Sequence, residues 1–148
     1  MYLILAVIGI AVVLIAVVWL KRKRDQERLE RHSITPDELQ ALLQSKQEVL
    51  LYDIRRPLDL LADSEVILGA TRVPPEDLLA NPSLIPRDKD AVIYCTCPGD
   101  ETSRRILREA LALHFQRIKL LKGGLAEWKR KGYPVERYNE SFHLEIRT

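Results

Sequence analysis

Hydrophobic residues occur along this chain first as one unbroken run and then as a periodic pattern. Residues 1–20 contain no charged side chain, and every Lys, Arg, Asp and Glu comes after them. In a helix, about 20 apolar residues at ~1.5 Å each match the ~30 Å hydrocarbon core of a bilayer. Only a helix satisfies all backbone polar groups within such a segment. The run therefore predicts a transmembrane helix over residues 1–20.

Two other structures produce apolar N-terminal runs, and neither fits well. A buried core helix is usually shorter and keeps a polar stripe. A cleaved signal peptide has a basic start and a small-x-small cleavage site, both of which this run lacks. Tyr2 and Trp19 stand near the two ends of the run, where aromatic rings favour the membrane interface. We therefore interpret the run as an uncleaved membrane anchor.

The basic tetrad at residues 21–24 (KRKR) sets the expected orientation. Cations directly after a span resist translocation, so the C-terminal part should face the cytoplasm, at the inner membrane if the protein is bacterial. A basic tetrad can also indicate nucleic-acid binding, but beside a span anchoring explains it more simply. The expected partner of residues 1–24 is membrane lipid, and no nucleic-acid partner is expected.

The remaining chain is expected to divide into three parts. Residues 25–32 (DQERLERH) contain a single Leu and cannot bury an apolar face alone. Residues 21–33 are therefore predicted to be a charged juxtamembrane linker, formed either as a solvated continuation of the helix or as a short spacer. A globular domain follows over residues 34–137, and residues 138–148 form a C-terminal tail.

Within the globular part, short apolar runs alternate with helical patterns. Thr35, Pro36 and Glu38 form a capping box with proline at the first helical position. Strands are predicted over residues 49–52, 91–95 and 118–121, and helices from Pro36, over 57–61, after 73–75, from Thr102 or Ser103, and over 125–131. Strands that alternate with helices predict an α/β fold with a parallel sheet covered on both faces. Ligands bind such sheets at the carboxyl ends of the strands.

Overall composition adds little to the prediction of function, because the net charge is only +2 and 47% of residues are hydrophobic. The positions of the two cysteines are more informative. Cys95 and Cys97 lie between a predicted strand and a helix N-terminus, where free amides and the helix dipole stabilise a thiolate. Buried cysteines also act as small hydrophobes, which explains Cys95 better than Cys97. No histidine shows ligand spacing around this pair, so no metal, no cofactor and no Cys/His dyad are expected.

Four further segments occur in a specific order. They are LYDIRRP at 51–57, LGA followed by VP at 68–74, IYC at 93–95, and GGLAEW with GYPV at 123–135. Together they resemble the signatures of single-domain rhodaneses, a family that transfers sulfane sulfur through a cysteine persulfide. The resemblance extends over residues 34–136 and implies the rhodanese fold. It also implies that Asp53 and Arg55 are structural, forming charge-assisted hydrogen bonds between loops, and that Trp128 packs in the core.

The resemblance also implies a site loop that departs from the family pattern. Its candidate catalytic residues are Cys95 and Cys97, and its candidate substrate-binding residues are Thr96, Gly99, Asp100, Glu101, Thr102, Ser103 and Arg104. Family members often read Cys-x-x-Gly-x-Arg-Ser, whereas here two carboxylates stand where a cation is expected. These carboxylates predict repulsion of an anionic donor such as thiosulfate. The related phosphatase pattern, Cys-x5-Arg, fails from either cysteine.

The choice of nucleophile rests on two conflicting signals. The match of the strand favours Cys95, and the length of the loop favours Cys97. We expect Cys95 to be the nucleophile, because the base of the loop begins at the strand end, and Cys97 to be a resolving or loop-lining thiol.

Two functions follow from the sequence. The first is a membrane-tethered sulfurtransferase that accepts sulfur from a small donor and passes it to a small or protein acceptor. The second is a weakly active or inactive rhodanese-like module that recruits a cytoplasmic partner to the membrane.

Overall fold

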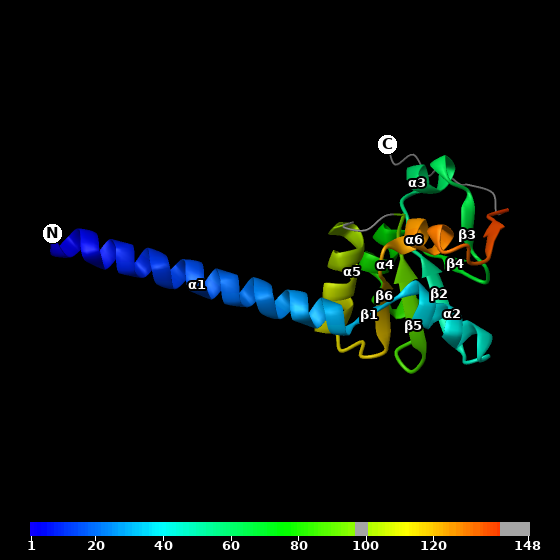
Figure 1. Ribbon diagram of the computed structural model, residues 1–148, viewed down its shortest axis with the longest axis horizontal. Coiled ribbons are helices and arrows are strands. Elements are labelled where there is room, and N and C mark those ends of the chain that lie inside the picture. The colour runs from blue at the N-terminus through cyan, green and yellow to red at the C-terminus, as the bar shows by residue number, and fades with distance from the viewer. Residues whose placement is uncertain (97–100, 140–148) are drawn as a thin grey trace. The chain divides into compact units, whose positions relative to one another are not determined.

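The computed structural model describes residues 1–96 and 101–139, apart from the side chains of residues 3 and 5, and comprises two compact units (Figure 1). The first unit, Met1–Arg31, is a single helix, α1 (Tyr2–Arg31), of 30 residues. The helix passes without a break through the basic tetrad and the charged residues after it. Of the two predicted forms of this stretch, the structure therefore contains the helical continuation rather than a spacer.

The predicted membrane span is not confirmed. Among the residues that the structure describes, no helix is both long enough and apolar enough to cross a membrane. The helix is apolar up to Leu20 and charged from Lys21 onwards.

The second unit, His32–Thr148, contains a parallel sheet, as predicted, and this sheet has five strands rather than only the three that the sequence indicated. The strands lie in the order β1 (Ser33–Ile34), β6 (Ile118–Leu121), β5 (Asp90–Tyr94), β2 (Val49–Asp53) and β4 (Thr71–Arg72). A separate antiparallel pair is formed by β3 (Glu65–Ile67) and β7 (Val135–Arg137). The strand predicted over residues 91–95 is shifted by one residue, which leaves Cys95 as the first residue beyond β5.

Helices connect these strands largely where the pattern predicts them. They are α2 (Pro36–Gln44), α3 (Pro57–Ala62), α4 (Pro75–Ala80), α5 (Glu101–Ala112) and α6 (Gly124–Arg130), with a short 3-10 turn, η1 (Pro82–Leu84). The capping box at α2 is present, with Glu38 N donating to Thr35 Oγ1 at 3.3 Å. The prediction that Thr102 or Ser103 caps α5 is wrong. The helix already includes Glu101, and the buried Ser103 hydroxyl has no hydrogen-bond partner in the described part of the chain.

Both faces of the five-stranded sheet are covered by apolar side chains. On one face, residues of α2, α6 and β3 pack against β2 and β5 in a cluster of Ile34, Leu39, Leu51, Ile67, Val92, Tyr94, Leu121, Leu125 and Trp128. The other face packs against α4 and α5. Trp128 is 1% exposed, and its Nε1 donates to the Pro134 carbonyl at 3.0 Å. The predicted core role of Trp128 is confirmed.

The register of the sheet brings three strand ends together. Asp53 of β2 pairs with Arg72 of β4 on one side and with Tyr94 of β5 on the other. Because all three strands are parallel, their carboxyl ends lie at one edge of the sheet. We call the ends of β2, β4 and β5 the carboxyl edge. The loop that begins at Cys95 starts from this edge.

Candidate functional site

Cys95 is held at the carboxyl edge by the start of α6. The residue is 5% exposed and is a thiol rather than half of a disulfide. Its carbonyl accepts a hydrogen bond from Leu125 N at 2.8 Å, and the carbonyl of Thr96 accepts one from Ala126 N at 3.0 Å. These bonds position the base of the loop on the rigid central strand and on the first turn of a helix.

Gly124 is required for this close approach. Its φ is +57°, and a Cβ added to it would lie 2.5 Å from the Cys95 carbonyl oxygen. Any other residue would clash with the loop and would also be strained at this φ. Glycine at position 124 therefore allows α6 to begin directly against the Cys95 carbonyl.

The structure describes six of the nine predicted loop and cysteine residues. Cys97, Gly99 and Asp100 lie outside the described residues. Thr96 and Ser103 keep buried side-chain oxygens near the two ends of the loop. Arg104 is exposed on α5, as is Glu101, and Thr102 is half-buried between them. The described loop therefore supplies a buried thiol and buried hydroxyls.

Glu101 is one of the two carboxylates that were expected to repel an anionic donor. Its side chain is 74% exposed, and its Oε1 forms an ion pair with Arg108 Nη2. A nearby cation offsets part of the field of a carboxylate, and solvent screens much of the remainder. The repulsion predicted from this residue is therefore weakened.

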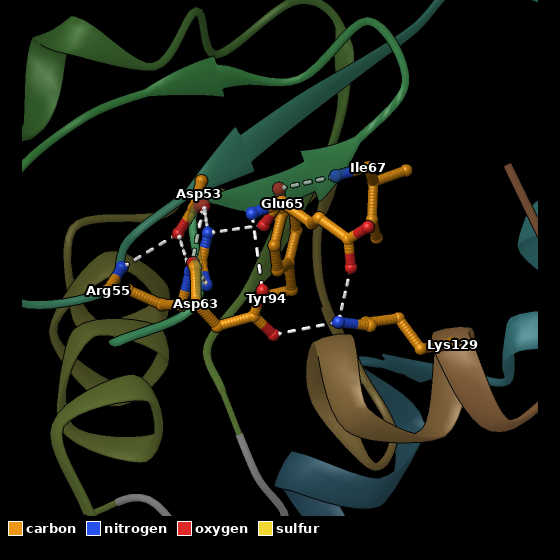
Figure 2. A network of polar contacts seen from close by, with 7 residues as sticks. All are labelled: Asp53, Arg55, Asp63, Glu65, Ile67, Tyr94 and Lys129. Carbon is orange, nitrogen blue, oxygen red and sulfur yellow. Dashed lines mark hydrogen bonds and ion pairs between the residues drawn. The ribbon is translucent and has the colours of Figure 1, made fainter. Parts of the chain in front are cut away.

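Asp53 and Arg55 form a buried ion pair at the carboxyl edge (Figure 2). Asp53 is 0% exposed and Arg55 is 1% exposed. Arg55 Nη2 lies 2.6 Å from Asp53 Oδ2, Nε lies within 3.0 Å of both carboxylate oxygens, and the Arg55 amide donates to Oδ1 at 3.0 Å. This is a buried pair rather than a solvated surface pair, as the predicted structural role requires.

The same guanidinium links two chain segments. Its Nη1 donates to the Asp63 carbonyl at 2.9 Å, and its Nη2 donates to the Glu65 carbonyl at 2.8 Å. Arg55 therefore ties the end of β2 to the segment that enters β3. With both Asp53 oxygens and two backbone carbonyls engaged, the guanidinium is well satisfied despite its burial.

Two residues that sequence reasoning did not single out complete this network (Figure 2). The Tyr94 hydroxyl accepts a hydrogen bond from Ile67 N at 3.1 Å, and burial, followed by the charge of Asp53, raises the pKa of Tyr94 well above its ordinary value. Tyr94 is therefore a neutral hydrogen-bonding group directly before Cys95. No local pattern distinguishes it from an ordinary buried strand residue.

Lys129 of α6 connects the network to the helix that holds the loop. Its Nζ lies 2.9 Å from Asp63 Oδ2 and also pairs with Glu65 Oε2. The hydrogen bond to Glu65 raises the pKa of Lys129 most, and the hydrogen bond to Asp63 raises it further. For Asp63, burial opposes ionisation, but hydrogen bonds from Lys129 and from the Glu65 amide outweigh it and lower the pKa. The α6 helix is therefore bonded to the same segment as Arg55.

Arg72, at the end of β4, was also missed by sequence reasoning. Two of its guanidinium nitrogens, Nε and Nη2, are shielded from solvent and have no hydrogen-bond partner in the described part of the chain. The signal that could have indicated it is a cation directly before the Val-Pro pair of the LGA…VP segment.

Among the described residues, no cluster of three or more His, Cys, Asp or Glu side chains is placed to hold a metal ion.

A family model and a sequence relative identify the family of this chain. The model of the rhodanese-like domain family matches residues 35–131. A sulfurtransferase from Allochromatium vinosum is 30% identical over 104 residues, which cover 70% of this chain and 94% of that protein.

Two solved structures share the fold. The crystal structure of a full-length protein from Lactobacillus plantarum has a TM-score of 0.68 and 23% identity, over 80% of this chain and 98% of that one. The crystal structure of a thiosulfate sulfurtransferase from Pseudomonas aeruginosa has a TM-score of 0.60 and 24% identity, over 76% of this chain and 22% of that one.

Proposed function

The chain belongs to the rhodanese-like domain family, and on that premise we propose that it is a sulfurtransferase in which Cys95 carries sulfane sulfur as a persulfide. The position of Cys95 supports this proposal most directly. The thiol is the first residue after the central strand of a parallel sheet, where such sheets bind ligands, and it precedes the 12-residue helix α5. A thiolate before a helix N-terminus is stabilised by backbone amides and the helix dipole.

The proposed chemistry proceeds in two displacements. The Cys95 thiolate attacks the outer sulfur of a donor such as thiosulfate, an S–S bond forms, and the S–S bond of the donor breaks with its electron pair leaving on sulfite. An acceptor thiolate then attacks the outer persulfide sulfur and regenerates the Cys95 thiolate. Each step exchanges one S–S bond for another, so no external oxidant or reductant is needed.

Intact-mass measurement tests this proposal. After the purified chain is incubated with thiosulfate or inorganic polysulfide, we expect a gain of about 32 Da, one sulfur atom, that dithiothreitol removes, because the persulfide is the covalent intermediate. If neither thiosulfate nor polysulfide produced an adduct, sulfur transfer would be contradicted. That result would favour the second candidate, a non-catalytic module that recruits a partner.

Neutralising Glu101 should change the rate of persulfide formation from thiosulfate very little. We expect Glu101→Gln to alter the rate of persulfide formation from thiosulfate by less than about twofold at 0.15 M salt, because the exposed carboxylate is paired with Arg108 and screened. Stopped reactions analysed by intact mass measure the rate. The matched control is Glu109→Gln, which removes an exposed carboxylate of the same helix that pairs with Arg105. A severalfold acceleration specific to Glu101→Gln would show that this carboxylate does repel the donor.

We also propose that residues 1–24 tether the domain to a membrane, with the domain on the cytoplasmic side. The support is the charge-free sequence of residues 1–20 followed by the basic tetrad. Apolar side chains along α1 are exposed, as at Ile15 and Trp19, and a lipid environment would cover them. The Lys23 ammonium lies 5.5 Å from the centroid of the Trp19 ring, a pairing suited to the membrane interface.

Fractionation and protease protection test the tether. In cells, the full chain should sediment with membranes and resist alkaline washing, whereas a chain that begins at Arg31 should stay in the supernatant, because the unit from His32 onward is compact by itself. Protease added to spheroplasts should leave the domain intact. Release of the full chain by alkaline washing would contradict the anchor, and digestion from outside would contradict the orientation.

A further inference from the structure

Unsatisfied buried polar groups gather at the ends of strands and helices around the site loop. Among the described residues, the buried side-chain nitrogens and oxygens without a hydrogen-bond partner belong to Arg72, Thr96 and Ser103. Arg72 ends β4 at the carboxyl edge, Thr96 follows Cys95, and Ser103 lies in the first turn of α5. These three residues come from separate segments, two of them next to the site loop and one on β4, two strands away from β5. A buried polar group without a partner is costly, so each of these groups needs an explanation.

Arg72 has the strongest need for a partner. A guanidinium remains charged in proteins and can only donate hydrogen bonds, so its two shielded nitrogens require an acceptor. The nearest acidic residue in the sheet register is Asp53, which pairs directly with Arg72 across β2 and β4. Both oxygens of that carboxylate are already bonded to Arg55. Asp53 is therefore engaged by Arg55, and neither shielded nitrogen of Arg72 has a hydrogen-bond partner in the described part of the chain.

The position of Arg72 suits a ligand at the site loop. Residues in register on neighbouring parallel strands point to the same face of a sheet, so Arg72, Asp53 and Tyr94 share one face. Tyr94 directly precedes Cys95, and Val73 N, the next amide after Arg72, donates to the Asp53 carbonyl at 2.9 Å. Arg72 is therefore rigidly placed two strands away from the start of the loop.

From these observations we propose that Arg72 is the residue that binds the anionic group of the sulfur donor. In relatives with Cys-x-x-Gly-x-Arg, a loop arginine faces the donor, but this chain has no arginine at that loop position. A cation on β4 would supply the missing charge from the sheet, and the hydroxyls of Thr96 and Ser103 are further donors for oxyanion oxygens. The inference rests on the proposed sulfur transfer and names its donor class, an oxyanion such as thiosulfate.

Equilibrium binding to the full-length Cys95→Ser chain in non-ionic detergent tests the inference without any reaction. Titration with thiosulfate should raise the thermal unfolding midpoint of this chain, since a ligand that binds the folded state stabilises it. Adding Arg72→Met should weaken thiosulfate binding by about tenfold or more, the size expected for loss of a charge-assisted hydrogen bond. Arg72→Lys should retain part of the affinity. Arg117→Met is the matched control, because Arg117 is exposed and pairs with Asp90 at the opposite end of β5.

Stability without ligand separates this role from a structural one. Because two nitrogens of the half-buried Arg72 guanidinium are shielded and have no partner in the described part of the chain, Arg72→Met should unfold at a midpoint equal to or above that of the parent when anions are absent. The inference would be overturned if Arg72→Met unfolded at a lower midpoint than the parent or kept the thiosulfate affinity of the parent. It would also be overturned if Arg117→Met weakened thiosulfate binding as much as Arg72→Met does. Loss of Arg72-dependent binding and absence of the 32 Da adduct are separate results, so this inference and sulfur transfer can fail independently.

Discussion

Replacing Cys95 by serine is expected to abolish the gain of about 32 Da from sulfur donors, whereas Cys97→Ser should retain it. The reason is position. Cys95 is the first residue after β5, and its carbonyl is fixed by Leu125 N, so its thiol has one defined location at the carboxyl edge. Cys97 lies further along the loop, outside the described residues. A nucleophile must be held where backbone amides and the start of α5 stabilise its thiolate.

Single and double variants make this test decisive. The Cys95→Ser/Cys97→Ser chain should show no adduct and controls for labelling elsewhere. Peptide mapping of the Cys97→Ser chain should locate the additional sulfur on the peptide that contains Cys95. If Cys95→Ser keeps the adduct and Cys97→Ser loses it, loop length rather than strand alignment identifies the nucleophile, and the role assigned to Cys95 is wrong.

Arg55→Met is expected to lower the free energy of unfolding by about 3–5 kcal/mol, the range for removing one partner of a buried ion pair. The variant leaves the Asp53 carboxyl group, at 0% exposure, without the guanidinium that donates to both of its oxygens. It also removes the bonds that Arg55 donates to the part-buried Asp63 and Glu65 carbonyls. The loss therefore combines an uncompensated charge with the loss of two bonds to the backbone.

Urea denaturation of a chain that begins at Arg31 measures this effect. That chain contains Trp128 but not Trp19, so tryptophan fluorescence reports on the domain core alone. Arg117→Met, which breaks an exposed ion pair with Asp90, should cost less than about 1 kcal/mol. Asp53→Asn/Arg55→Met should cost less than the sum of the two single variants, since no charge is left buried. Additive costs would contradict the interpretation of these residues as one coupled pair.

Local sequence signals determined much of the secondary structure of this protein. The capping box at Thr35 and Glu38 specifies the start of α2, because its hydrogen bonds join residues within one helical turn. The apolar runs that became β2, β5 and β6 are long enough to bury their side chains in a parallel sheet. The Gly-Gly pair was visible as a turn, but only the structure shows that Gly124 lies against the Cys95 carbonyl.

The short strands could not be predicted in this way. The strands β1 and β4 have two residues each, and β3 and β7 have three, which is too short for a period-two pattern. They exist because neighbouring strands offer them backbone partners. Without β4, the sequence contains no reason to place Arg72 beside Asp53.

The sequence by itself determined which residue types stand at the site: a cysteine at a strand end, the Asp-x-Arg pair and the glycines of the turn. Their ordered motifs were sufficient to identify the family. Only the tertiary structure decided which charges remain unpaired. Arg55 takes both oxygens of Asp53, Arg108 pairs with Glu101, and two shielded nitrogens of Arg72 have no hydrogen-bond partner in the described part of the chain. Whether a charge is compensated depends on contacts between segments that are distant in the sequence. Local sequence patterns do not predict those contacts.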